Sequence, residues 1–248
     1  MITLYDIVGK PPIKCWSSNP WKARYVLNYK KLPYRSVYLD YEKVGSTVRD
    51  AGVPPSRFKP DGSPVHTSPS IIDDATGAKV TDSYMIAEYL DKQYPDTPNV
   101  FPPGTEALQA AFYQHFNDRF AEAALLLVPC IPNILEKEST LEYFHGNMLA
   151  ILGKPVDQLK PAGEELEKLW GRLFALFDAM DGWYEKSSGP FLVGDQPSFG
   201  DFTVAASLMG MKILFGEESE DWKKVSAANN GRWLKLLSDL EAYTSVEN

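Results

Sequence analysis

Three side chains that could act as a nucleophile or stabilise one stand close together near the start of the chain: Cys15, Ser17 and Ser18. They follow the run ITLYDIV, typical of a short strand, and precede PWKARYVLNYKK, which has the spacing of an amphipathic helix. The turn before a helix faces unpaired backbone N–H groups and a partial positive charge. We therefore expect this turn to favour an anion such as a thiolate.

The order of residues in this turn ranks the three candidates. Asn19 is a good N-cap and Pro20 a good first helical residue, so we expect the helix to begin there with Ser17 just outside its positive end. Cys15 could be a nucleophile if its pKa were lowered. It stands four residues before that cap, however, too far for an effect that fades within the first turn. Ser17 and Ser18 remain as candidates for contact with a ligand, and packing is the expected role of Cys15.

A second motif, HTSPSII, places Pro69 at the start of an apolar run. Strands tolerate proline at an edge or a first position, so one interpretation is a proline that simply caps the strand. The other is a cis peptide that turns the backbone N–H and C=O of Ser68 outward, where an extended peptide could pair with them.

A third motif, TDSYMIAEYL, places Asp82 and Ser83 directly before a predicted amphipathic helix. The helix N-terminus suits a carboxylate ligand because it supplies unpaired N–H groups and positive charge. The structural alternative is an ordinary N-cap at either residue, worth about 0.5–2 kcal/mol.

A fourth motif, FLVGDQPSFGDF, holds Ser198 and Asp201 at the spacing of a capping box before an apolar helix. We expect this pair to be structural, because burying the helix requires its first turn to be satisfied locally.

The elements that carry these motifs fall into two parts. Residues 1–94 follow the order β-α-β, a polar loop from Gly45 to Pro64, then β-β-α, which predicts a small α/β layer. Residues 95–104, rich in Pro and Gly, predict a linker. Residues 105–248 show helical periodicity and predict an all-α bundle. We assign two stripes on its helices to the core: Leu108, Phe112, Phe116 and Phe120, and Leu166, Leu169, Trp170, Leu173, Phe174, Phe177 and Met180.

The composition excludes several classes of protein. The chain of 248 residues carries a net charge of −8, so nucleic acid and anionic membrane surfaces are unexpected partners. The sequence shows neither a secretion signal nor a long apolar run, and with two cysteines it predicts a cytoplasmic protein with free thiols. The three histidines lack partners at metal-ligand spacing, so we expect no metal.

Taken in this order, the motifs resemble those of the glutathione transferase superfamily over nearly the whole chain. The opening WSSNPWKARYVLNYK looks like the serine-type fungal class called FuA, which is related to bacterial glutathione-dependent β-etherases. In such proteins the active residue precedes a basic residue by five positions and an arginine by seven, and Lys22 and Arg24 match both counts for Ser17. The sequence departs from the family in having Ser18 where proline commonly follows.

The resemblance implies an N-terminal thioredoxin-like domain that binds glutathione, a C-terminal helical domain, and a homodimer. Ser17 would stabilise the glutathione thiolate, and the other implied glutathione contacts are Ser68, Asp82, Ser83 and, for the glycyl carboxylate, Lys59. The implied hydrophobic acceptor site comprises Pro11, Trp16, Phe116 and Phe120.

Three functions are compatible with this resemblance. The leading one is a glutathione S-transferase that conjugates hydrophobic or aromatic electrophiles, including lignin- or wood-derived compounds, with ether cleavage or peroxide reduction as side activities. The alternative is a non-catalytic, ligandin-type binder of aromatic or polyphenolic compounds. A thiol-disulfide or dehydroascorbate reductase would require Cys15 as its nucleophile.

Overall fold

The computed structural model describes residues 1–159 and 161–246. The chain forms two compact units: Met1–Val100 together with the segment from Glu241 onward, and Phe101–Leu240. The boundary after Val100 falls inside the predicted linker. The segment that follows Leu240 belongs with the first unit, although the sequence placed it with the helical domain.

The first unit is built on a four-stranded sheet with the order β2-β1-β5-β6. Its strands are β1 (Ile2–Ile7), β2 (Tyr34–Leu39), β5 (Ser70–Asp73) and β6 (Ala78–Thr81). Strands β1 and β2 are parallel, in a register that pairs Ile2 with Tyr34, and the other neighbours are antiparallel. Every residue of β1 is buried because the strand lies between two neighbours and under helices.

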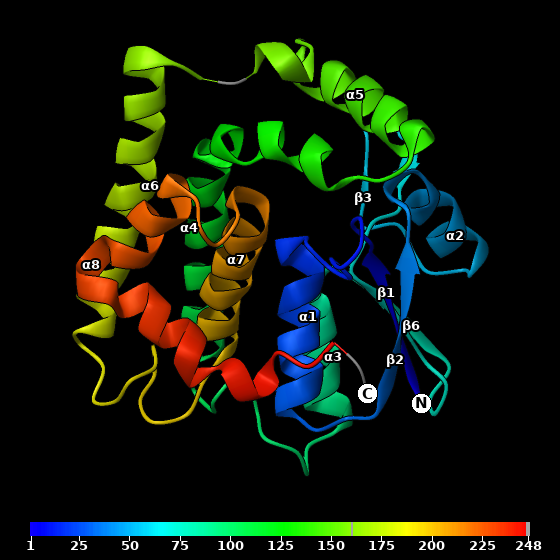
Figure 1. Ribbon diagram of the computed structural model, residues 1–248. Helices are drawn as coiled ribbons and strands as arrows, with labels where there is room; N and C mark the ends of the chain where they lie inside the picture. Colours follow the sequence, from blue (N-terminus) through cyan, green and yellow to red (C-terminus); the bar gives the residue numbers. More distant parts are fainter. Residues whose placement is uncertain (160, 247–248) are drawn as a thin grey trace. The chain divides into compact units, whose positions relative to one another are not determined.

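Three helices accompany this sheet: α1 (Ser18–Tyr29), α2 (Val44–Asp50) and α3 (Ser83–Gln93). Helices α1 and α3 pack side by side against one face, and α2 lies at the other (Figure 1). The order β-α-β then β-β-α is the one that the sequence predicted for residues 1–94. The arrangement brings the N-terminal ends of α1 and α3 to the same unit, where the predicted glutathione contacts lie.

The polar stretch between β2 and β5 contains short elements that the sequence did not predict. They are a 3₁₀ turn (Tyr41–Lys43), helix α2, and the two-residue strands β3 (Arg57–Phe58) and β4 (Pro64–Val65). Each is too short for hydrophobic periodicity to show.

The second unit is helical. Its α-helices are α4 (Glu106–Glu122), α5 (Glu138–Leu152), α6 (Gly163–Tyr184), α7 (Phe199–Phe215) and α8 (Glu220–Asp239). Short 3₁₀ segments lie at Ala124–Leu126, Val128–Ile134 and Val156–Gln158. Helix α7 is buried along most of its length, and α8 is interrupted where Asn229 and Asn230 adopt positive φ.

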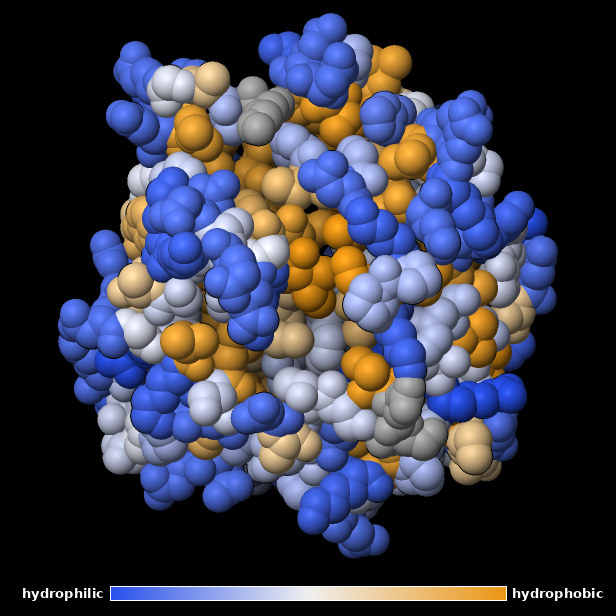
Figure 2. All heavy atoms as spheres, viewed as in Figure 1, coloured by the Kyte–Doolittle hydropathy of each residue, from blue (hydrophilic) through white to orange (hydrophobic). Residues whose placement is uncertain are grey.

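The predicted core stripes are confirmed in part, since Phe120, Leu166 and Phe174 are only half-buried. Phe112 and Phe116 on α4 are buried, as are Leu173 and Phe177 on α6, but Leu108 is 69% exposed. The prediction for Leu108 was wrong because the next residue, Gln109, is the buried one at this end of α4. On the face shown in Figure 2, hydrophilic residues cover most of the surface and hydrophobic residues gather in smaller groups. None of the described helices combines the length and apolar character that crossing a bilayer requires.

Candidate functional site

Helix α1 begins earlier than the sequence predicted. Ser17 is the N-cap, with extended backbone angles, and Ser18 is the first helical residue. The prediction that Asn19 caps the helix was wrong. Pro20 fits at the third position as well as at the first, because the N–H groups of the first turn lack intrahelical partners in any case.

The Ser17 side chain makes no capping hydrogen bond with the described residues of α1. Elsewhere in the chain, cap residues do use their side chains in this way: Ser219 accepts from Trp222 N across 3.0 Å at the start of α8. The first turn of α1 also contains no acidic residue. The positive end of α1 therefore lies beside a hydroxyl that the helix does not use and is not neutralised by a carboxylate in its own first turn.

Cys15 is two residues from the cap, closer than predicted, but its environment opposes ionisation. The side chain is 4% exposed. Burial, reinforced by the negative charge of Asp6, raises the pKa of the Cys15 thiol to about 12. Its neighbour Trp16 is also buried and donates its indole N–H to the Val8 carbonyl. Of the residues predicted in this loop, Pro11 is the exposed one.

Ser68 is bonded to strand β1. The Ser68–Pro69 peptide bond is cis. The Ser68 hydroxyl donates to the Tyr5 carbonyl across 2.8 Å, and the residue is 9% exposed. The hydroxyl is thus used by the fold, and the backbone of Ser68 is held against the C-terminal half of β1.

Asp82 caps helix α3. Its Oδ1 accepts hydrogen bonds from Tyr84 N (2.9 Å) and Met85 N (3.3 Å). The residue has φ 74°, a conformation that costs a non-glycine residue energy and is concentrated at functional sites. Ser83, the first residue of the helix, is buried.

A buried lysine near the start of α1 is influenced by the charge of Asp82 at the start of α3. Lys22, on α1, is 2% exposed and donates to Asn19 Oδ1 across 3.2 Å. Burial lowers the pKa of Lys22 to about 8, while the charge of Asp82 at the start of α3 opposes the shift. A positive charge on Lys22, in the first turns of α1, adds to the attraction of this helix N-terminus for an anion.

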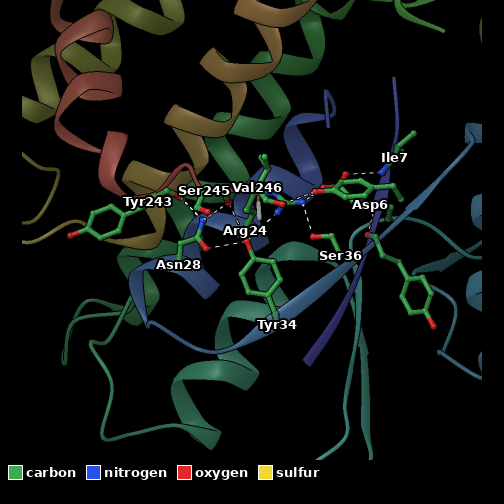
Figure 3. A network of polar contacts seen from close by, with 12 residues as sticks. Asp6, Ile7, Arg24, Asn28, Tyr34, Ser36, Tyr243, Ser245 and Val246 are labelled. Atoms are coloured by element: carbon green, nitrogen blue, oxygen red, sulfur yellow. Dashed lines mark hydrogen bonds and ion pairs between the residues drawn. The ribbon is translucent and has the colours of Figure 1, made fainter. Parts of the chain in front are cut away.

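A second basic side chain of α1, Arg24, forms a buried ion pair with β1. Arg24 Nη2 donates to Asp6 Oδ2 across 2.6 Å, and neither side chain is exposed (Figure 3). Arg24 also donates to Tyr34 OH (3.1 Å) and Ser36 Oγ (3.2 Å). The nearby Asp6 carboxylate holds the pKa of Arg24 above its usual value although burial opposes this, so Arg24 stays charged.

The remaining predicted residues belong to other elements. Lys59 is exposed next to β3. In the second unit, the rings of Phe116 and Phe120 stack with centroids 5.4 Å apart; Phe116 is buried and Phe120 half-buried. Among the described residues, no cluster of three or more His, Cys, Asp or Glu could hold a metal ion.

The capping box lies inside the second unit. Ser198 N and Oγ donate to Asp201 Oδ2 across 2.8 and 2.7 Å. The other oxygen of Asp201 accepts from Leu192 N and Tyr184 OH. All four donors and the carboxylate belong to this unit, and their geometry is that of a capping box at the start of α7.

Comparison with known proteins identifies the class. The model of the glutathione S-transferase N-terminal domain matches residues 14–98, and that of the C-terminal domain matches residues 107–243. The chain therefore belongs to the glutathione S-transferase family of enzymes, and the predicted superfamily and two-part fold are confirmed.

Individual relatives are similar over almost the full chain. The glutathione S-transferase-like protein ustS of Aspergillus flavus is 31% identical, over 94% of this chain and 87% of its own. A glutathione S-transferase of Ceriporiopsis subvermispora, crystallised with glutathione, is 34% identical with a TM-score of 0.93, over 100% of this chain and 99% of its own. Glutathione transferase GSTFuA3 of Phanerochaete chrysosporium is also 34% identical, with a TM-score of 0.91, over 100% of this chain and 98% of its own.

The sequence did not predict the buried polar residues in and around α1. Asp6 had a detectable signal, since a carboxylate inside an apolar strand is rarely buried without a partner. Lys22 and Arg24 were noted only for their spacing from Ser17. Tyr34 had no signal, because a tyrosine in a strand is ordinary.

Proposed function

We propose that this protein binds glutathione at the N-terminus of α1, stabilises its thiolate with the Ser17 hydroxyl and conjugates glutathione through that sulfur to hydrophobic or aromatic electrophiles. The observation that carries the proposal is the state of Ser17, which caps α1 without using its hydroxyl for the helix. A similar chain from Ceriporiopsis subvermispora crystallised with glutathione supports the ligand.

The energetics of one hydroxyl are sufficient for this role. A free thiol has a pKa of about 8.5 and is only a few per cent thiolate at neutral pH. Lowering that pKa by about two units requires about 2.7 kcal/mol. A hydrogen bond to a charged group contributes about 1.5–3 kcal/mol, and the open end of α1 adds to it.

The rest of the tripeptide finds complementary groups in the first unit. The backbone of Ser68 would pair with the cysteinyl residue of glutathione. Asp82 and Ser83 would hold the γ-glutamyl amine and carboxylate, supported by the strained backbone of Asp82 and the N-terminus of α3. Exposed Lys59 would reach the glycyl carboxylate.

The chemical step is a displacement by sulfur. The thiol proton passes to solvent, the thiolate forms a C–S bond with the electrophile, and a leaving group departs with its electron pair. With an aryl ether the leaving group is a phenolate, so the same step would cleave lignin-like ethers. Phe120, half-buried beside Phe116, offers an aromatic surface suited to flat, apolar acceptors.

The test compares the unchanged protein with Ser17→Ala and, as a control, Ser219→Ala, which removes a different N-cap serine. Glutathione binding is measured by calorimetry, and turnover is measured with an aryl halide and an aryl ether. We expect turnover in the unchanged protein and in Ser219→Ala, and a loss of about tenfold to a hundredfold in Ser17→Ala, in line with one charged hydrogen bond. Glutathione binding without turnover of any electrophile would support the ligandin-type alternative instead.

We further propose a cytoplasmic homodimer. Cys15 and Cys130 are both thiols, which suits a reducing compartment. The first unit exposes Phe58 (66%) and Met85 (52%), apolar side chains that a second copy could cover. Sedimentation analysis of the unchanged protein and of Phe58→Ser tests this, with dissociation of the variant as the expected result and a monomeric unchanged protein as the contrary one.

A further inference from the structure

The segment of residues 241–246, called here the tail segment, is attached to the first unit through its backbone carbonyls. Asn28 Nδ2 donates to Tyr243 O (2.8 Å) and Ser245 O (2.9 Å). Tyr38 OH donates to Val246 O across 2.8 Å. Asn28 belongs to α1, so the tail segment is bound directly to the helix that begins at the site (Figure 3).

Tyr34 connects the tail segment to the buried ion pair. Its hydroxyl donates to Asn28 Oδ1 at 3.0 Å, with Ser245 O at 3.3 Å, and accepts from Arg24 Nη1 at 3.1 Å. The residue is 3% exposed, and its ring centroid lies 5.7 Å from the Arg24 guanidinium. A single buried hydroxyl thus contacts both ends of the network, and Figure 3 shows it between them.

The ion pair in turn fixes the position of α1 relative to β1. Arg24 is bonded to Asp6, and the adjacent residue Tyr5 accepts the hydrogen bond of Ser68. Two consecutive residues of β1 therefore hold the cis-proline turn on one side and α1 on the other. Arg24 lies seven residues after Ser17, about two helical turns along the same face of α1.

We propose that Tyr34, together with the tail segment, positions the Ser17 hydroxyl against the glutathione sulfur by holding Arg24 in place. Tyr34 is a positioning residue in this account, because it acts through Arg24 and α1. The inference rests on the proposed function of Ser17. Hydrogen-bond strength falls steeply with angle and distance, so a small rotation of α1 weakens thiolate stabilisation while the fold persists.

Two tyrosines make a matched test. Tyr34→Phe keeps the ring beside Arg24 and removes the hydroxyl that contacts Arg24 and Asn28. Tyr38→Phe makes the same chemical change at a second tyrosine whose hydroxyl donates to the tail segment and whose ring centroid is 5.9 Å from Arg24. Asn28→Ala removes the side-chain bonds to the tail segment and the Oδ1 that accepts from Tyr34 OH, and leaves the bond between Tyr34 and Arg24 in place.

The readouts are glutathione affinity by calorimetry and the pKa of the bound thiol, followed by the ultraviolet absorbance of the thiolate as pH is varied. In Tyr34→Phe we expect the bound thiol's pKa to rise by about 0.5 unit and affinity to fall about threefold, the scale of one net hydrogen bond. In Asn28→Ala and in Tyr38→Phe, which weaken the attachment of the tail segment but keep the bond between Tyr34 and Arg24, we expect smaller rises. A purely structural role would lower thermal stability and leave the thiol's pKa unchanged.

The outcomes separate this inference from the proposed function. If the unchanged protein binds glutathione with a lowered thiol pKa but Tyr34→Phe raises that pKa no more than Tyr38→Phe does, the positioning role of Tyr34 is wrong. If Asn28→Ala and Tyr38→Phe both keep the thiol pKa of the unchanged protein while Tyr34→Phe does not, the tail segment has no part in it. If the unchanged protein does not bind glutathione, the proposed function itself fails.

Discussion

Arg24 and Asp6 meet inside the first unit at 2.6 Å with no exposure of either side chain, and they join the helix that begins at Ser17 to the central strand of the sheet. Removing one partner of such a pair leaves the other charge buried without compensation. We expect Arg24→Met to lower the free energy of unfolding by about 3–5 kcal/mol. Urea denaturation measures this loss.

The matched control is an arginine in an exposed pair. Arg49 and Asp50 are 61% and 68% exposed, so we expect Arg49→Met to change stability by less than about 1 kcal/mol. Equal effects of the two substitutions would show that the buried pair does not hold the unit together.

Removing the Asp201 carboxylate should strongly destabilise the second unit. It accepts four hydrogen bonds from Ser198, Leu192 and Tyr184 in a fully buried position. We expect Asp201→Ala to destabilise the protein by about 3–5 kcal/mol, since it orphans several buried donors. Asp221→Ala, which removes a half-exposed partner of Lys224, should cost less than about 1 kcal/mol. Thermal unfolding of both variants provides the comparison.

The lowered pKa of Lys22 predicts that the free energy of unfolding depends on pH. Burial lowers its pKa to about 8 in the folded chain, below the value of about 10.4 for an unfolded lysine. Between these values the unfolded chain binds more protons, so the contribution of Lys22 to stability rises with pH. Relative to Lys22→Met, the unchanged protein should gain about 1–2 kcal/mol of unfolding free energy between pH 7 and pH 9.5. A difference that stays flat or falls would contradict the buried, depressed lysine.

The two cysteines should differ in reactivity. Burial raises the pKa of Cys15 to about 12, whereas Cys130 is half-buried. Because the thiolate is the reacting species, we expect a thiol-alkylating reagent at pH 8 to label Cys130 well before Cys15. Mass spectrometry of the digested protein follows both sites. Rapid labelling of Cys15 would reopen the reductase hypothesis.

Much of the first unit could be predicted because its strands and helices are long enough to show their own periodicity. The run ITLYDIV and the helix after Ser83 are examples. Helix α2, with seven residues, was missed because two turns of a Gly- and Ser-containing sequence carry little pattern. The start of α1 was predicted two residues too late. Asn19 is as typical of an N-cap as Ser17 is, and the following Pro20 is typical of a first helical residue.

The bracing of the site was beyond prediction for a different reason. The bonds from Asn28 and Tyr38 end on backbone carbonyls of the tail segment, which every residue possesses. Such contacts leave no trace in residue type or spacing. The candidate residues Ser17, Ser68 and Asp82 were predicted from their motifs. The hydrogen bonds that join Arg24, Tyr34 and Asn28 to the tail segment could be seen only in the structure.

The most direct test of the account is the pKa of the thiol of bound glutathione in the unchanged protein, Ser17→Ala and Ser18→Ala, read from thiolate absorbance against pH. We expect a value about two units below that of free glutathione in the unchanged protein and in Ser18→Ala, and a rise of about 1–2 units in Ser17→Ala. If the bound thiol keeps its low pKa in Ser17→Ala, the hydroxyl at the start of α1 does not stabilise the thiolate.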